Sequence, residues 1–136
     1  KLRLSREENP IELFTLSACR TALGDRDSEL GLAGLALQSG AKSAIGSLWY
    51  VDDIATTIYF IRFYRLLDRG FPKGDAMRQV RAEFANNQIE LLGQSVYDRA
   101  GEILIDNLTP NQQRKLKSRL DHPFFWAAHI MLGLPW

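Results

Sequence analysis

The sequence has one cysteine, two histidines and no apolar run long enough to cross a membrane. A single cysteine excludes a disulfide within the chain and favours a reducing compartment. A membrane span needs roughly 20 consecutive apolar residues, and the charged opening KLRLSREENP lacks the apolar core of a signal peptide. A net charge of +1 argues against direct binding to nucleic acid by electrostatic attraction. We therefore expect a cytoplasmic protein that binds neither membrane nor nucleic acid.

The length of 136 residues fits one domain with its own core. The chain opens on Lys1, and we expect it to be part of something longer. No metal-ligand cluster and no phosphate-binding glycine loop is visible in the sequence. We therefore expect no metal site and no obligatory cofactor.

Apolar strand patterns and helical patterns alternate along the first 85 residues. Residues 11–18 and 43–49 predict buried strands, and an alanine- and glycine-rich helix between them is expected to stop at Gly40. A long helix capped by Asp52 or Asp53 should run to Gly70, followed by a helix with Pro72 in its first turn. This order predicts an α/β fold with a mostly parallel sheet.

The remaining residues give weaker signals. We interpret residues 86–121 as a helical insertion, with a helix starting at Thr109–Pro110. The basic residues of that helix indicate a solvated face more than a docking patch. Residues 125–132 predict a last strand that turns His129 to the face opposite Ile130.

Cys19 follows the first predicted strand directly. The carboxyl ends of strands in an open parallel sheet form the edge where ligands bind, so this thiol is a candidate nucleophile. Ser17 precedes it, and Arg20 could stabilise its thiolate form. A cysteine nucleophile also needs a base, yet nothing in the spacing directs His122 or His129 toward it. The alternative is an inert cysteine packed in the core.

Four blocks together resemble the carboxyl-terminal half of a CHAT domain, a family of caspase-like clan CD cysteine peptidases often found beside tetratricopeptide repeats. They are LSACRTALGD at 16–25, GLAGLALQSGAKSAIGSLWYVDD at 31–53, FYRLLDRGFPKGDAMRQVRAEF at 63–84 and HPFFWAAHIMLG at 122–133. The resemblance implies a caspase-like three-layer sandwich with helices on both faces of the sheet. Residues 1–136 would form its carboxyl-terminal part, and residues 86–121 exceed what the family usually carries there.

The resemblance also implies roles for individual residues. Cys19 would be the nucleophile, since Ser17-Ala18-Cys19-Arg20 is similar to the middle of the caspase pattern. The caspase histidine lies about 50 residues before the cysteine, which would place it roughly 30 residues before Lys1, so neither histidine of the chain should replace it. Separases, which look like relatives, carry a similar Leu-Trp segment whose aspartate contacts a basic P1 side chain. That aspartate aligns with Asp53, and the implied substrate-binding residues are Asp53, Trp49, Ser17 and Arg20.

Three interpretations remain open. The first is a cysteine endopeptidase that acts on a protein or peptide and needs an upstream half carrying the histidine. The second is an inactive CHAT-like domain that serves as a regulated interaction module, with a tetratricopeptide-repeat region or another regulator as partner. The third is an unrelated doubly wound domain in which Cys19 is buried. Asp53 itself has an alternative role as a helix cap.

Overall fold

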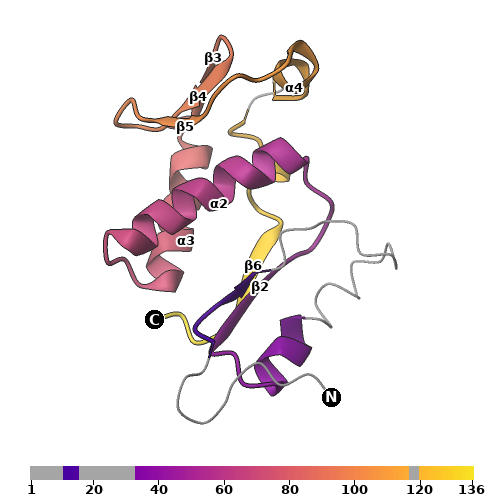
Figure 1. Ribbon diagram of the computed structural model, residues 1–136, viewed down its shortest axis with the longest axis vertical. Coiled ribbons are helices and arrows are strands. Elements are labelled where there is room, and N and C mark those ends of the chain that lie inside the picture. Colours follow the sequence, from indigo (N-terminus) through magenta and orange to yellow (C-terminus); the bar gives the residue numbers. More distant parts are fainter. Residues whose placement is uncertain (1–10, 16–32, 117–119) are drawn as a thin grey trace. The chain divides into compact units, whose positions relative to one another are not determined.

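The computed structural model describes residues 11–15, 33–116 and 120–136 (Figure 1). The chain divides into two compact units. The first unit combines residues up to Tyr50 with Ala128–Trp136, and the second unit is the continuous segment Val51–Ala127. The first unit is therefore closed by a strand from the far end of the sequence.

The first unit contains a three-stranded sheet in the order β1-β2-β6. The strands are β1 (Phe14–Thr15), β2 (Ser43–Ser47) and β6 (His129–Gly133). All five residues of β2 are buried, in agreement with the buried strand that the sequence predicts there. β1 pairs with β2 in parallel, whereas β6 pairs with β2 antiparallel. An α/β architecture is confirmed, but a mostly parallel sheet is not, because only one of these two pairings is parallel.

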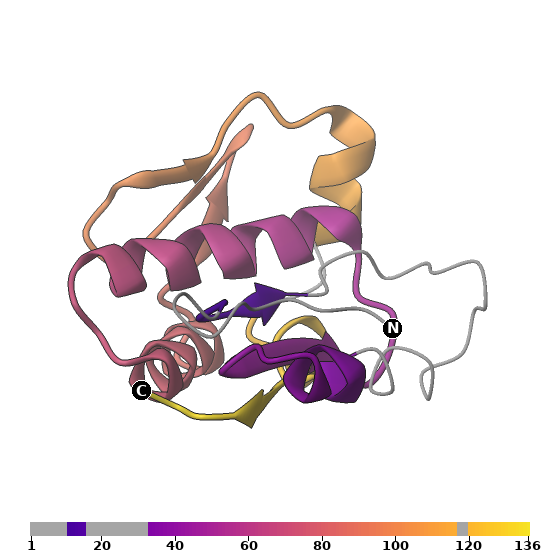
Figure 2. The ribbon, with the colours of Figure 1, turned by 60° about the horizontal axis from the view of Figure 1, so that its bottom comes forward.

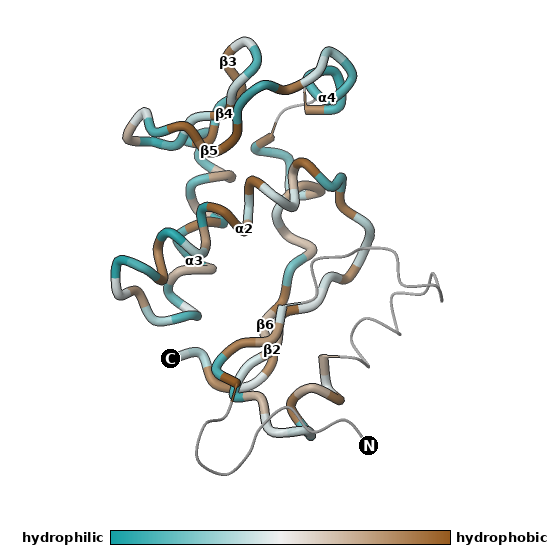
Figure 3. The backbone as a smooth tube through the Cα atoms, in the orientation of Figure 1, coloured by the Kyte–Doolittle hydropathy of each residue, from teal (hydrophilic) through white to brown (hydrophobic). Residues whose placement is uncertain are grey.

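A short helix packs beside this sheet through small side chains. Residues 33–38 are helical, and Gly40 follows with a φ of 109° that ends the helix in the left-handed region, as the sequence predicts. Ala33, Ala36, Ala41 and Ala44 form a buried cluster with partly buried apolar neighbours, Ile11, Phe14, Leu37 and Leu132. Figure 3 shows the hydrophobic colouring along β2 and β6 that accompanies this cluster. Alanine brings the helix close to the strands because its side chain is a single methyl group.

Two helices form the core of the second unit, α2 (Asp53–Asp68) and α3 (Lys73–Ala85) (Figure 2). Both agree with the helices predicted from the sequence, and Ala76, Val80 and Phe84 form the buried edge of α3 as expected. Tyr59 lies against Phe84 with ring centroids 5.9 Å apart, which joins the two helices through aromatic contact.

A second sheet follows α3 in the same unit. Its strands are β3 (Glu90–Leu92), β4 (Ser95–Tyr97) and β5 (Ile103–Ile105), all antiparallel in the order β3-β4-β5. The helical character predicted for residues 86–121 is therefore wrong over most of its described length, and holds only for α4 (Pro110–Leu116). Strands this short carry too few residues for an alternating pattern to be recognised. The solvated face expected for α4 agrees with its burial, since Leu116 is its one buried residue.

The segment before β6 is a tight turn rather than the start of a strand. Pro123–Phe125 forms one turn of 3₁₀ helix, and the His122 Nδ1 atom accepts a hydrogen bond from the Phe124 N–H at 3.1 Å. The indole N–H of Trp126 donates to the Asp121 carbonyl at 3.0 Å. The strand predicted for residues 125–132 therefore begins at His129 instead, because proline and the histidine cap favour the turn.

Candidate active site

Three of the predicted site residues, Ser17, Cys19 and Arg20, lie outside the described residues. What the structure gives is the strand that leads to them, β1, and the parallel neighbour of that strand, β2. Phe14 is the register partner of Ala44, and Thr15 is the register partner of Ile45. Both strands therefore run toward the same edge of the sheet, which is the edge where ligands bind in open α/β sheets.

The carboxyl end of β2 is held by a buried polar pair. Ser47 Oγ and His129 Nδ1 share a hydrogen bond of 2.8 Å, and the two residues are 1% and 0% exposed. They are also register partners across the antiparallel β2–β6 pairing. The Leu48 N–H donates to the Ala128 carbonyl at 2.9 Å, which continues the pairing by one step. Trp49 follows in the bend after β2 and is half-buried, so the chain leaves the sheet directly after these two hydrogen bonds.

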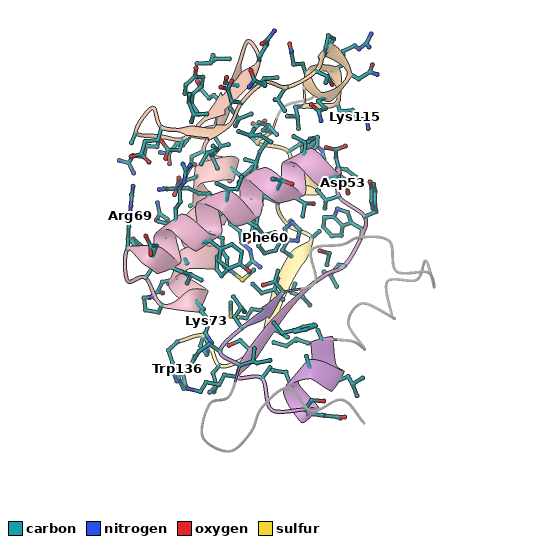
Figure 4. The ribbon with its side chains drawn as sticks, viewed as in Figure 1. Asp53, Phe60, Arg69, Lys73, Lys115 and Trp136 are labelled. Carbon is teal, nitrogen blue, oxygen red and sulfur yellow. The ribbon has the colours of Figure 1, made fainter. Side chains whose placement is uncertain are left out.

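At the start of the second unit, Asp52 rather than Asp53 caps α2. Its Oδ1 atom accepts hydrogen bonds from the backbone N–H groups of Ile54 at 2.9 Å and Ala55 at 3.4 Å. Its Oδ2 atom lies 3.8 Å from the Nζ atom of Lys115. Asp53 is the first helical residue and is exposed, and Figure 4 shows it at the end of α2 where Lys115 also lies. The alternative role of Asp53 as the helix cap is therefore wrong, since the neighbouring Asp52 caps α2.

Both histidines of the chain have structural hydrogen bonds. The Nδ1 atom of His122 caps the 3₁₀ turn, and that of His129 bonds to Ser47. Each histidine therefore uses its Nδ1 atom in a local structural contact.

A buried ionic cluster in the second unit escaped the sequence analysis. Arg62 on α2 donates from Nε to Glu83 Oε1 at 2.7 Å and from Nη2 to Oε2 at 3.2 Å. Its Nη1 atom lies 3.6 Å from Asp98 Oδ2, and the side chains of the three residues are at most 8% exposed. Asp98 Oδ1 also accepts from the N–H groups of Ala100 and Glu102, each at 2.9 Å. The cluster thus joins α2, α3 and the loop after β4.

Two pKa shifts accompany the fold of the second unit. Burial raises the pKa of Tyr59 to about 12, against a smaller opposing effect of Arg81, which interacts with the phenol. The Ser95 hydroxyl, which donates to Asp106 at 2.6 Å, lowers the pKa of that carboxyl, with help from the Asn107 N–H. Neither group belongs to the predicted site.

The part of the chain that the structure describes holds neither a metal cluster nor a membrane-spanning helix. No group of three or more histidine, cysteine, aspartate or glutamate side chains there could hold a metal ion. No described helix is both long enough and apolar enough to span a bilayer. A shallow groove at the α2–α3 turn is lined in part by Arg69, Phe71, Asp75 and Arg78, and neither Trp49 nor Asp53, the two described residues of the predicted site, lines it.

The three-stranded sheet and the helix of residues 33–38 define an α/β protein of mixed topology. The family model of the CHAT domain matches residues 1–134, and the chain belongs to this family. CHAT domains are related to caspase-like cysteine peptidases. No curated protein and no solved structure matches the chain.

Proposed function

We propose that this chain carries the nucleophile of a cysteine endopeptidase, with Cys19 in that role. The observation that carries the proposal is the CHAT family match over residues 1–134. The parallel pairing of β1 and β2 supports it, because the residues after β1 then belong to the ligand-binding edge of the sheet.

The reaction would proceed in two steps. The Cys19 thiolate attacks the carbonyl carbon of the scissile amide, and backbone N–H groups stabilise the oxyanion. The C–N bond breaks, the amine leaves with a proton from the histidinium, and a thioester remains on sulfur. Water, deprotonated by the same histidine, then hydrolyses the thioester and regenerates the thiol.

The histidine base is assigned to a part of the domain that precedes Lys1. Caspases place it about 50 residues before the cysteine. The structural hydrogen bonds of His122 and His129 support the same assignment. The upstream half of the domain is therefore a required partner in this proposal.

Asp53 is assigned to the selection of arginine or lysine at P1, together with Trp49. A carboxylate binds a guanidinium by charge and by paired hydrogen bonds. The exposure of Asp53 and the capping of α2 by Asp52 support the assignment, because the helix start does not require Asp53 as its cap. Ser17 and Arg20, which flank Cys19, complete the proposed substrate-binding set.

The domain architecture, the cellular location and the partner are part of the same proposal. We assign residues 1–136 to the carboxyl-terminal part of one caspase-like three-layer sandwich, within which residues 86–121 form an insertion. A cytoplasmic location and a tetratricopeptide-repeat or regulatory partner follow from the family resemblance and the single cysteine.

The test uses the protein with its upstream half and a set of peptides that differ only at P1. Cys19→Ala should abolish cleavage. Asp53→Asn should lower the preference for arginine over leucine about 10- to 100-fold, the range expected when a charge-assisted hydrogen bond worth about 1.5–3 kcal/mol is lost. The matched control is Asp52→Asn, which removes the same charge one residue earlier while asparagine preserves the cap.

Each result separates the interpretations. Equal cleavage after leucine and arginine by the unmodified protein would exclude the pocket assigned to Asp53. A well-folded protein without cleavage, whose Cys19 reacts readily with a thiol reagent, would favour the interaction module. A thiol that reacts only after unfolding would favour the core-cysteine interpretation.

A further inference from the structure

A buried hydrogen bond between Ser47 and His129 joins the side chains of two neighbouring strands. Both side chains are buried, and burying a polar group costs free energy unless a hydrogen bond compensates it. Apolar side chains at these two positions would hold the sheet without that requirement. What the pair adds is direction, since a hydrogen bond of 2.8 Å fixes the two side chains relative to each other.

The Ser47–His129 pair lies at the end of the sheet that is next to Trp49. Ser47 is the last residue of β2, His129 is the first residue of β6, and the Leu48–Ala128 hydrogen bond lies next to them. Trp49 is the next residue along the chain. The Ser47–His129 hydrogen bond therefore holds the end of the β2–β6 pairing, directly before the chain continues to Leu48 and Trp49.

We propose that Ser47 and His129 are positioning residues that hold Trp49 for binding of the substrate P1 side chain. The role of Trp49 rests on the peptidase function proposed above, whereas the attachment of its segment does not. Neither residue touches the substrate in this proposal, and both act through the backbone at Leu48 and Trp49.

The chain offers a matched control on the same strand. Ser43 begins β2, is fully buried, and donates its hydroxyl hydrogen bond to the Leu134 carbonyl. Ser43→Ala and Ser47→Ala each remove one buried hydroxyl from opposite ends of β2. A purely structural role predicts the same behaviour for both variants, whereas a positioning role predicts a difference only at the Trp49 end.

The first measurement is hydrogen exchange at the Leu48 amide, which needs no activity. Exchange should be at least about tenfold faster in Ser47→Ala than in Ser43→Ala, because only Ser47→Ala removes the Ser47–His129 hydrogen bond beside the Leu48 amide. Equal exchange at Leu48 in the two variants would overturn the proposal.

The second measurement is the kinetics of arginine-P1 cleavage by the protein with its upstream half. Ser47→Ala should raise KM about tenfold and leave kcat within about twofold, while Ser43→Ala should change neither beyond about twofold. A KM that is unchanged in Ser47→Ala, or raised equally in both variants, would contradict the positioning role.

The double variant Ser47→Ala/His129→Leu separates positioning from stability. Replacing both polar partners by apolar groups removes the donor and the acceptor of this bond together, so thermal stability should be higher than in Ser47→Ala. KM should nevertheless remain raised and Leu48 exchange fast, since the directional bond is still missing. If KM and the Leu48 exchange rate both return to their values in the unmodified protein along with thermal stability, the pair is merely structural.

If the unmodified protein cleaves no peptide, the peptidase proposal fails, and the Leu48 exchange still decides the positioning role.

Discussion

Single side chains with buried charge have the largest expected effect on stability. Arg62 illustrates this, because its guanidinium lies between two carboxylates that are almost fully removed from water. A buried ion pair contributes little net stability when it is intact, yet removing one partner leaves an uncompensated charge in the interior.

We expect Arg62→Ala to lower the free energy of unfolding by about 3–5 kcal/mol, because Glu83 and Asp98 would then face each other without a cation. Urea denaturation followed by circular dichroism measures this change. The control is Arg78→Ala, which breaks an exposed pair with Asp75 and should cost less than about 1 kcal/mol. Similar losses in the two variants would mean that Arg62 is not buried in solution.

Tyr59 predicts a specific dependence of stability on alkaline pH. Its folded-state pKa of about 12 lies above the ordinary value of 10.0, so the folded protein retains a proton that the unfolded chain loses. The stabilisation is fully present below pH 10 and should decline between pH 10 and 12, by about 1.4 kcal/mol per pH unit at most. Denaturation of Tyr59→Phe over the same range should lack this component of the decline. A curve identical to that of the unmodified protein would contradict the assignment.

At the scale of elements, the end of β6 has a local backbone constraint. β6 ends at Gly133, whose φ of 94° lies in the left-handed region. A Cβ atom there would collide with the Lys42 carbonyl oxygen and approach Leu37 Cδ2 to 2.9 Å. Only glycine satisfies both the backbone angle and the close contact.

Gly133→Ala should therefore destabilise the protein by more than about 2 kcal/mol, through backbone strain of about 1–2 kcal/mol together with the collision. Gly93→Ala is the matched control, because its φ of 64° is also left-handed but a Cβ atom there would meet open space. The control should cost only about 1 kcal/mol in a thermal denaturation experiment. If the two variants have equal stability, the contact with Lys42 does not restrict the strand.

At the scale of the whole molecule, the two compact units differ in how the chain builds them. The second unit is continuous in sequence, whereas the first needs residues from both ends. β6 supplies the antiparallel partner for all five residues of β2.

Deletion of residues 128–136 should therefore remove amide protection from β2, because its hydrogen bonds to β6 are lost. Protection in α2 should persist, since the backbone hydrogen bonds of a helix lie within the helix itself and its ionic partners Glu83 and Asp98 are retained. Hydrogen exchange with mass spectrometry resolves the two segments. Simultaneous loss of protection in β2 and α2 would indicate one cooperative unit instead.

The sequence alone determined the features that depend on neighbouring residues. The helices α2 and α3, the stop at Gly40 and a cap at Asp52 or Asp53 follow from local periodicity, glycine and short polar side chains, whereas the structure decided that Asp52 is the cap. The family membership was also evident, because each of the four matching blocks is a continuous run of residues that can be recognised in the sequence.

Only the tertiary structure decided which distant residues meet. Ser47 and His129 are 82 positions apart, and Arg62 and Glu83 are 21 apart, so no local pattern could pair them. The direction of β6 and the strands within residues 86–121 were likewise decided by pairing across the sheet. Local preference selects helices and turns, whereas strand partners and buried charge pairs are selected by the free energy of burying them together.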